Sequence, residues 1–335
     1  MKKFIRLLSV IIILSTLLFP QQKYTLKMAT VAPEGSSWMA EMRDFEKDIK
    51  ELTNGRIQFQ VYPNAVQGSE VDVLRKMRLG QLHSGTFTGV GLGTIVPDVR
   101  VLEIPFLFRN SDEIDYVYGT LFEHFQKRFL EEGFYLAGWA EVGLVYLYTH
   151  EKVESLQDFN KVKMWLWKGD PLARTAFEVC KISSIPLEVT DVHTSLQTGL
   201  INGVYVSPYA LLALQWFTKV KYMLGYPLTN SIGAVLITKK QMDKMPEDLQ
   251  KILMQKTKEY MRKIVLKSRT ENLESIEVLK EAGIQVTPVR AATAIAEIDA
   301  AGKVIREKLV GELYSRELLD EMLRLLEEYR STHGS

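Results

Sequence analysis

Lys161-Val-Lys-Met-Trp-Leu-Trp-Lys-Gly-Asp-Pro171 decides the fold, because it predicts a β-strand that ends at a Gly-Asp-Pro turn. Side chains of a strand alternate between its two faces. Trp165 and Trp167 therefore share one face, and Met164 and Leu166 share the other. Two neighbouring indoles form a flat apolar wall.

A second aromatic group, Tyr205 and Tyr209, follows in the next predicted elements of the chain. If it converges with the Trp165–Trp167 wall, the protein binds an organic ligand rather than a metal or a nucleic acid.

Around this strand, short apolar runs alternate with amphipathic stretches, which is typical of an α/β protein. Glycine-rich Gly89–Thr94 is expected to be a loop. The predicted strands are 24–28, 56–62, 84–88 and 135–148, and the predicted helices are 37–52, 71–79, 111–131, 171–180 and 191–198.

From Met245 onward the chain is expected to be almost wholly helical. Pro246 and the two acids after it suit a first helical turn. The pattern then continues to Gly283, which corresponds to roughly 50 Å of helix. Such a helix is too long for one compact domain, so we expect it to run along two domains, with a kink possible near Leu266–Arg269.

The first 22 residues have the pattern of an export signal. Lys2, Lys3 and Arg6 precede an apolar run from Leu7 to Phe19. That run would span only about 20 Å as a helix, short of the roughly 30 Å hydrocarbon core. A cleaved signal peptide and a periplasmic or extracytoplasmic location are therefore favoured over a membrane anchor.

Composition narrows the function of the remaining residues, which are enough for two domains. Without the three basic residues of the signal, the chain has 39 basic and 41 acidic residues. This balance argues against nucleic-acid binding. No later apolar run reaches membrane-spanning length, so the mature protein is not expected to be embedded in a membrane. The single cysteine, Cys180, is predicted to be a small core residue.

Motifs of common chemistries are weak or absent. Gly89–Thr94 is similar to a phosphate loop, but its spacing differs and Pro97 follows where a helix should continue. The five histidines show no metal-ligand spacing, and no nucleophile elbow occurs. A pair of distant carboxylates would leave no local signature, so a secreted hydrolase stays open as an alternative.

Four separate stretches resemble the extracytoplasmic solute-binding proteins of TRAP transporters, the tripartite ATP-independent periplasmic carriers. The resemblance covers nearly the whole mature chain. The stretches are Tyr62-Pro-Asn-Ala-Val-Gln-Gly-Ser-Glu70, Ile104-Pro-Phe-Leu-Phe-Arg109, Leu196-Gln-Thr-Gly-Leu-Ile-Asn-Gly203 and Met245-Pro-Glu-Asp-Leu-Gln-Lys251.

The resemblance implies a two-domain periplasmic-binding-protein-like α/β fold with discontinuous domains, a ligand cleft between them and a long domain-spanning helix. It places 23–142 plus 233–272 in domain I and 143–232 plus 273–330 in domain II. The implied activity is capture of a small organic solute and its delivery to TRAP membrane subunits, without catalysis or a cofactor. The binding protein of an ATP-driven importer is an alternative.

The chain departs from the family pattern at the ligand anchor. The resemblance implies an arginine that pairs with a ligand carboxylate, but Trp165 stands at that position. The second basic position of the family corresponds to Val145 or Tyr146 in this chain, and neither residue is basic. An indole has one N–H donor and no charge. The predicted ligand is therefore mainly apolar or aromatic, with room for one polar or carboxylate end.

The candidate ligand-binding residues lie on segments that the resemblance places at the cleft. Each has a structural alternative: a core ring for Trp165 and Trp167, a hydrophobic staple for Trp38, and a cap of the helix that begins at Val71 for Glu70. The full set is Trp38, Glu70, Trp139, Tyr146, Trp165, Trp167, Tyr205 and Ser207.

Overall fold

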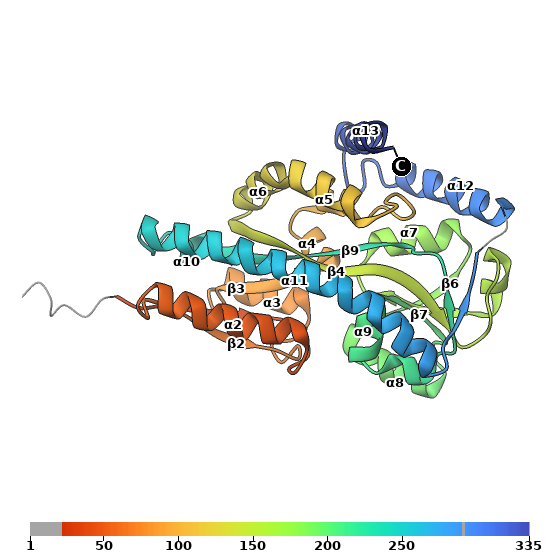
Figure 1. The fold of residues 1–335 in the computed structure, drawn as a ribbon, viewed down its shortest axis with the longest axis horizontal. Helices are drawn as coiled ribbons and strands as arrows, with labels where there is room; N and C mark the ends of the chain where they lie inside the picture. The colour runs from red at the N-terminus through yellow and green to blue at the C-terminus, as the bar shows by residue number, and fades with distance from the viewer. Residues whose placement is uncertain (1–21, 290–291, 335) are drawn as a thin grey trace, which may run out of the picture.

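The computed structural model describes residues 22–289 and 292–334 of the 335-residue chain. The predicted signal peptide lies, except for its last residue, outside the described residues. Figure 1 shows an α/β molecule in which helices surround a central sheet. The strands are β1 (Tyr24–Ala29), β2 (Ile57–Tyr62), β3 (Ser84–Thr88), β4 (Phe134–Thr149), β5 (Lys163–Trp167), β6 (Ser183–Leu187), β7 (Gly203–Val206), β8 (Tyr222–Leu224), β9 (Thr229–Thr238) and β10 (Gln285–Thr287).

The helices cover this sheet and connect its strands. The α-helices are α2 (Ser37–Leu52), α3 (Glu70–Arg78), α4 (Gly89–Gly93), α5 (Ser111–Thr120), α6 (Phe122–Glu131), α7 (Pro171–Val179), α8 (Val192–Thr198), α9 (Pro208–Ala213), α10 (Lys239–Met242), α11 (Glu247–Glu281), α12 (Ala292–Lys308) and α13 (Arg316–His333). Short 3-10 helices are η1 (Pro97–Glu103), η2 (Leu156–Lys161), η3 (Val189–Asp191) and η4 (Trp216–Lys219).

The sheet divides into two halves that share β4. The first half has the order β2-β1-β3-β9-β4, with β1 parallel to β2 and β3. The second half continues from β4 through β7, β5 and β6, and β8 pairs with both β4 and β10. Along β4, residues 134–145 pair with β9, whereas residues 146–149 pair with β7. Two adjacent strands therefore carry the chain from one half to the other.

Helix α11 is one continuous helix of 35 residues, as expected from the sequence. At about 1.5 Å per residue it is roughly 50 Å long, and Figure 1 shows it running across both halves of the sheet. Arg269 on α11 bonds Glu141 of β4 and Asp115 of α5, while Asn272 accepts from the backbone of Tyr209 in α9. The helix thus contacts elements on both sides.

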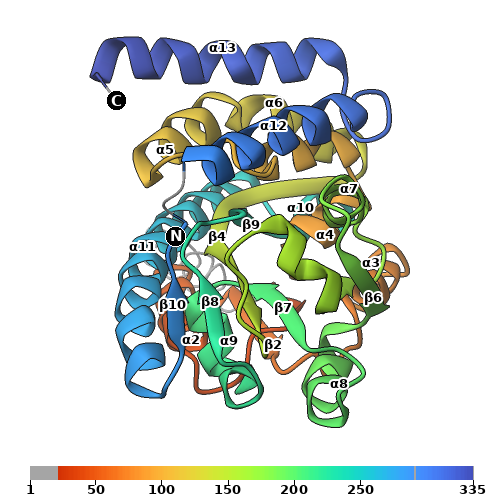
Figure 2. The same ribbon diagram turned by 90° about the vertical axis from the view of Figure 1, so that its right-hand side faces the viewer.

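The end of the chain returns to the N-terminal half. Helix α13 packs on α5 and η1, and Arg330 pairs with the buried Glu113 at 2.7 Å. Figure 2 shows α12 and α13 above the sheet, beside α5 and α6. The assignment of 273–330 wholly to a second domain stays a prediction, because α13 contacts elements of the predicted first one.

Two local expectations need correction. The helix predicted over 111–131 is divided at Leu121 into α5 and α6, next to Gly119 and Thr120, which are poor helix formers. The glycine-rich segment that was expected to be a loop forms the short helix α4.

Candidate functional site

A cavity of about 260 Å³ lies between the two halves of the sheet. Its walls include Thr30, Thr88, Trp167 and Ser207, which end or directly follow β1, β3, β5 and β7. Ligands of open α/β sheets bind outside the carboxyl ends of the strands. The volume is just below the roughly 300–1,000 Å³ of sites for drug-sized ligands, which indicates a small solute.

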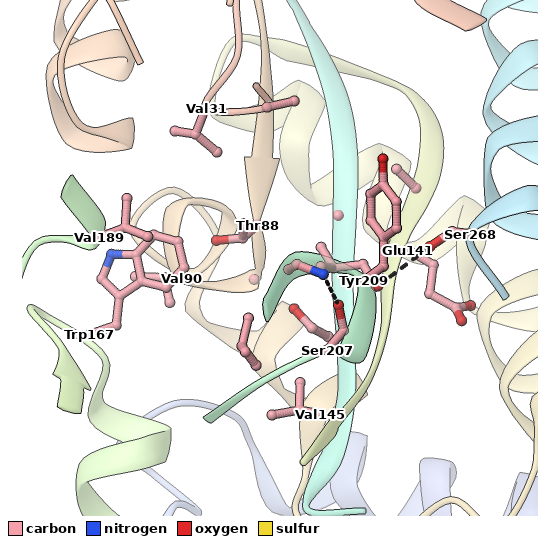
Figure 3. A pocket seen from close by; sticks show the side chains of 18 of the residues that line it. Val31, Thr88, Val90, Glu141, Val145, Trp167, Val189, Ser207, Tyr209 and Ser268 are labelled. Carbon is pink, nitrogen blue, oxygen red and sulfur yellow. Dashed lines mark hydrogen bonds between the residues drawn. The ribbon is translucent and has the colours of Figure 1, made fainter. Parts of the chain in front are cut away.

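The two halves of the sheet and α11 supply different parts of the lining. Figure 3 draws Trp167 and Val189 on one side of the cavity and Tyr209, Glu141 and Ser268 on the other. Six of the eight sequence-predicted residues are in the lining. These are Trp38, Glu70, Trp165, Trp167, Tyr205 and Ser207.

Trp139 and Tyr146 do not lie on the cavity wall, which corrects their predicted cleft-side position. Trp139 packs among Tyr118, Phe122 and other rings of the core, and its indole N–H donates to the carbonyl of Tyr118 at 3.3 Å. Tyr146 packs in the core of the second half, whereas its neighbour Val145 lines the cavity. Val145 and Tyr146 are neighbours on β4, so their side chains point to opposite faces, and only Val145 lies in the cavity lining.

The two indoles of β5 lie on one face, as predicted, but differ in burial. Trp165 is 1% exposed, and its N–H donates to the carbonyl of Leu187 at 3.0 Å. Its ring stacks on Tyr205 at 5.1 Å and contacts Trp216 edge-on at 5.2 Å. Trp167 lies 5.5 Å from Trp165 and is only half-buried. Trp165 is therefore a core ring that touches the cavity, and Trp167 is the more accessible surface.

Ser207 and Tyr205 hold the second half of the site in shape. Ser207 is fully buried and caps α9, accepting from the N–H of Ala210 at 3.4 Å. The hydroxyl oxygen of Tyr205 accepts from the N–H of Trp167 at 3.1 Å. Burial raises the pKa of Tyr205 well above its usual value, so the phenol stays protonated.

Glu70 does not cap the helix on which it lies, because Ser69 is the N-cap and forms a capping box with Asp72. The buried carboxylate of Glu70 instead accepts from the N–H of Thr88 at 2.8 Å and from its hydroxyl at 3.0 Å. Burial raises the pKa of Glu70 to about 7, although the bonds from Thr88 lower it in part. This carboxyl can therefore change its charge near neutral pH.

The raised pKa of Glu70 predicts a pH-dependent stability. The folded state holds the proton more tightly, so wild-type stability falls as pH rises from about 4.5 to 7. Glu70→Gln removes this titration and keeps an acceptor for Thr88. As pH rises from about 4.5 to 7, the free energy of unfolding of Glu70→Gln should increase by about 1–3 kcal/mol relative to that of the wild type. Denaturation of both proteins at a series of pH values measures this change. A difference in free energy of unfolding that stays the same at every pH would contradict the prediction.

Arg100 lines the cavity and is buried between two carboxylates. Its Nε lies 2.8 Å from Glu103, also on η1, and Nη1 lies 3.0 Å from Asp170, which follows β5. Burial lowers the pKa of Arg100, but the charges of Asp170 and Glu103 outweigh it and raise the pKa above its usual value. The Arg100–Asp170 pair joins the two sides of the cavity.

The glycine-rich segment has a structural explanation in these acids. A Cβ on Gly89 would lie 1.8 Å from a carboxylate oxygen of Glu103, and one on Gly91 would lie 2.3 Å from Glu70. Only glycine allows the backbone of α4 to approach both side chains. Because carboxylates occupy the space beside these glycines, the segment is unsuited to phosphate.

A second contact joins the two sides at the cavity wall. The hydroxyl oxygen of Tyr209 accepts from the N–H of Ser37 at 3.1 Å. The hydroxyl of Ser37 donates to Glu271 of α11 at 2.6 Å. The first half, the second half and the long helix therefore meet in one hydrogen-bonded group.

Sequence reasoning did not identify Arg100, Glu103 or Asp170. The signal was present in Val99-Arg-Val-Leu-Glu-Ile104, where two opposite charges three residues apart interrupt an apolar run. Charged side chains in such a run are expected to be buried only if paired. In residues 22–289 and 292–334, no group of three or more potential metal ligands is found.

The fold and the cavity between its halves define a two-domain solute-binding protein. More specifically, the chain belongs to the bacterial extracellular solute-binding protein family 7 (DctP), whose model matches residues 28–309. Within the described residues, no helix is long and apolar enough to cross a membrane.

Relatives and solved structures agree with this family. A solute-binding protein of Roseobacter denitrificans is 28% identical over 263 residues, covering 76% of this chain and 80% of the relative. A TRAP periplasmic solute-binding protein of Desulfovibrio salexigens with bound orotic acid has a TM-score of 0.84 at 20% identity, covering 92% and 99% of the two chains. A Bordetella pertussis extracytoplasmic solute receptor that binds pyroglutamic acid has a TM-score of 0.83 at 17% identity, covering 90% and 99%.

Proposed function

We propose that this protein is the extracytoplasmic solute receptor of a TRAP-type transporter, exported through its N-terminal signal peptide. It captures a small organic solute between domain I (23–142 plus 233–272) and domain II (143–232 plus 273–330). It then delivers the solute to TRAP membrane subunits. The observation that carries the proposal is a cavity at the carboxyl ends of strands from both halves, in a chain of this family.

Capture follows from the way the cavity is built. A ligand that touches both sides stabilises the closed arrangement by its differential affinity for it. The Ser37–Tyr209 and Arg100–Asp170 contacts already join the two sides. Binding without catalysis is favoured over a hydrolase because the matched family consists of solute-binding proteins.

The lining favours an apolar or aromatic solute. Trp38, Trp167 and Val189 present apolar surface, and the indole of Trp165 replaces the cation that the family pattern would supply. The orotic acid and pyroglutamic acid of the two solved relatives are carboxylic acids. A carboxylate in this cavity would meet Arg100 only in competition with Glu103 and Asp170.

Native mass spectrometry and transport assays test the proposal. Protein isolated from its host is expected to carry a small organic mass that is released unchanged on unfolding. Uptake of that solute into vesicles containing the TRAP membrane subunits should require the receptor and an ion gradient but no ATP. Uptake that requires ATP would favour the importer alternative, and a released product that differs from the solute would favour the hydrolase.

A further inference from the structure

The charged residues of the cavity are mostly acidic. Among the described lining residues, the basic side chains are Arg100 and Lys267. The acidic ones are Glu41, Glu70, Glu103, Glu141, Asp170 and Glu271. Glu141 is paired at 2.7 Å with Arg269, which is outside the lining, but the remaining acids still outnumber the bases. An anionic solute would therefore enter a lining with excess negative charge.

Both basic side chains of the described lining are already paired. Lys267 lies 2.9 Å from Glu41. Arg100 lies between Glu103 and Asp170, and all three side chains are buried. A ligand carboxylate would have to displace one of these acids to reach the guanidinium.

Asp170 is fixed in this position by the fold. Its Oδ1 caps α7, accepting from the N–H groups of Leu172 at 3.1 Å and Ala173 at 3.2 Å. The same oxygen lies 3.0 Å from Nη1 of Arg100, and Oδ2 lies 3.5 Å from the hydroxyl of Tyr205. Because α7 begins directly after β5, the aspartate reaches Arg100 from the opposite side of the cavity.

We propose that Asp170 is a specificity-determining residue: it occupies Arg100 as an internal carboxylate and restricts the cavity to organic solutes without negative charge. This proposal rests on the proposed receptor function and narrows its ligand class. A buried anion without a cation loses its hydration at a cost of several kcal/mol. An uncharged solute avoids that cost, and a cation gains from the surrounding acids and from the face of Trp167.

Three probes of nearly equal shape test the proposal: benzoate, benzamide and benzamidinium, with charges −1, 0 and +1. Binding is measured by isothermal titration calorimetry and by tryptophan fluorescence of the folded protein at pH 8. We expect the wild type to bind benzamide or benzamidinium at least about tenfold more tightly than benzoate. Asp170→Asn keeps a residue that caps helices well, so α7 should persist.

In Asp170→Asn, Nη1 of Arg100 loses its partner charge. Benzoate should then bind about tenfold more tightly than to the wild type, and benzamidinium about tenfold more weakly. Asp243→Asn, a surface change in an ion pair with Lys239, is the matched control and should leave all three affinities unchanged.

The outcomes separate this proposal from the receptor function. Benzoate binding as tightly as the other two probes in the wild type, or unchanged charge preference in folded Asp170→Asn, would overturn the role of Asp170 and leave the receptor function standing. If Asp170→Asn fails to fold, the proposal is tested by the wild type alone, which must bind benzoate more weakly than benzamide or benzamidinium. If none of the probes binds the wild type, the aromatic ligand class and the role of Asp170 are rejected, whereas the receptor function is decided by uptake of the solute found by mass spectrometry.

Discussion

Arg100→Met is expected to be the most destabilising charge change in the cavity. Methionine keeps the apolar stem but leaves Glu103 and Asp170 buried without their cation. Removal of one partner from a buried ion pair costs about 3–5 kcal/mol. Urea denaturation at pH 7 should show a loss of this size in the free energy of unfolding.

The pH dependence distinguishes lost charge from lost packing. Burial raises the pKa of Glu103 even with Arg100 in place, so acid should protonate Glu103 in Arg100→Met, and the deficit should shrink as pH falls from 7 to 5. Adding Glu103→Gln and Asp170→Asn to Arg100→Met should restore much of the stability at pH 7, because no buried charge is then left unpaired. A deficit that is the same at both pH values and in the triple variant would contradict an electrostatic origin.

The sequence predicted the elements around the cavity because their signals are local. The predicted and observed ends of α2 are the same, because Ser36 caps its start and Gly55, with a φ of 74°, follows its end. The common face of Trp165 and Trp167 followed from strand alternation alone. Periodicity also predicted the long helix, because apolar residues recur along most of its length.

The ion group was not predictable in the same way, because its members are distant in the chain. Arg100 and Asp170 are separated by 70 positions, and their contact exists only when the two halves of the sheet come together. Similarly, the bulge between Glu141 and Gly143 in β4 shifts the register beside β9. Position along a strand could therefore not decide between Val145 and Tyr146 before the pairing was known.

These contacts change the interpretation of the missing arginine. The sequence showed a tryptophan at the expected anchor and suggested a pocket without a cation. The structure contains a cation, Arg100, on a different element and already neutralised. The apolar character of the site therefore depends on internal ion pairing as well as on the indoles.

Replacement by alanine is expected to affect mainly the stability of the protein at Trp165 and mainly its affinity for the solute at Trp167. Trp165 is 1% exposed and packs against three aromatic rings, so Trp165→Ala should lower the free energy of unfolding by about 3–5 kcal/mol. Trp167 is half-buried, and Trp167→Ala should lower it by only about 1 kcal/mol. Solute affinity should fall at least about tenfold in Trp167→Ala, since aromatic residues commonly dominate binding energy.

The phenylalanine variants provide the matched comparison. Trp165→Phe removes the indole donor to the carbonyl of Leu187, which still accepts from the N–H of Lys168 at 3.2 Å, so the loss of stability should be only about 0.5–1.5 kcal/mol. Trp167→Phe should retain most of both stability and affinity. Calorimetric titration with the solute found by mass spectrometry, together with urea denaturation, measures the two effects. A stable Trp165→Ala protein that has lost its solute would show that Trp165 is itself the ligand anchor. Because its N–H is already bonded to Leu187, we expect Trp165 to offer the solute ring surface only, so it cannot replace the hydrogen bonds of an arginine.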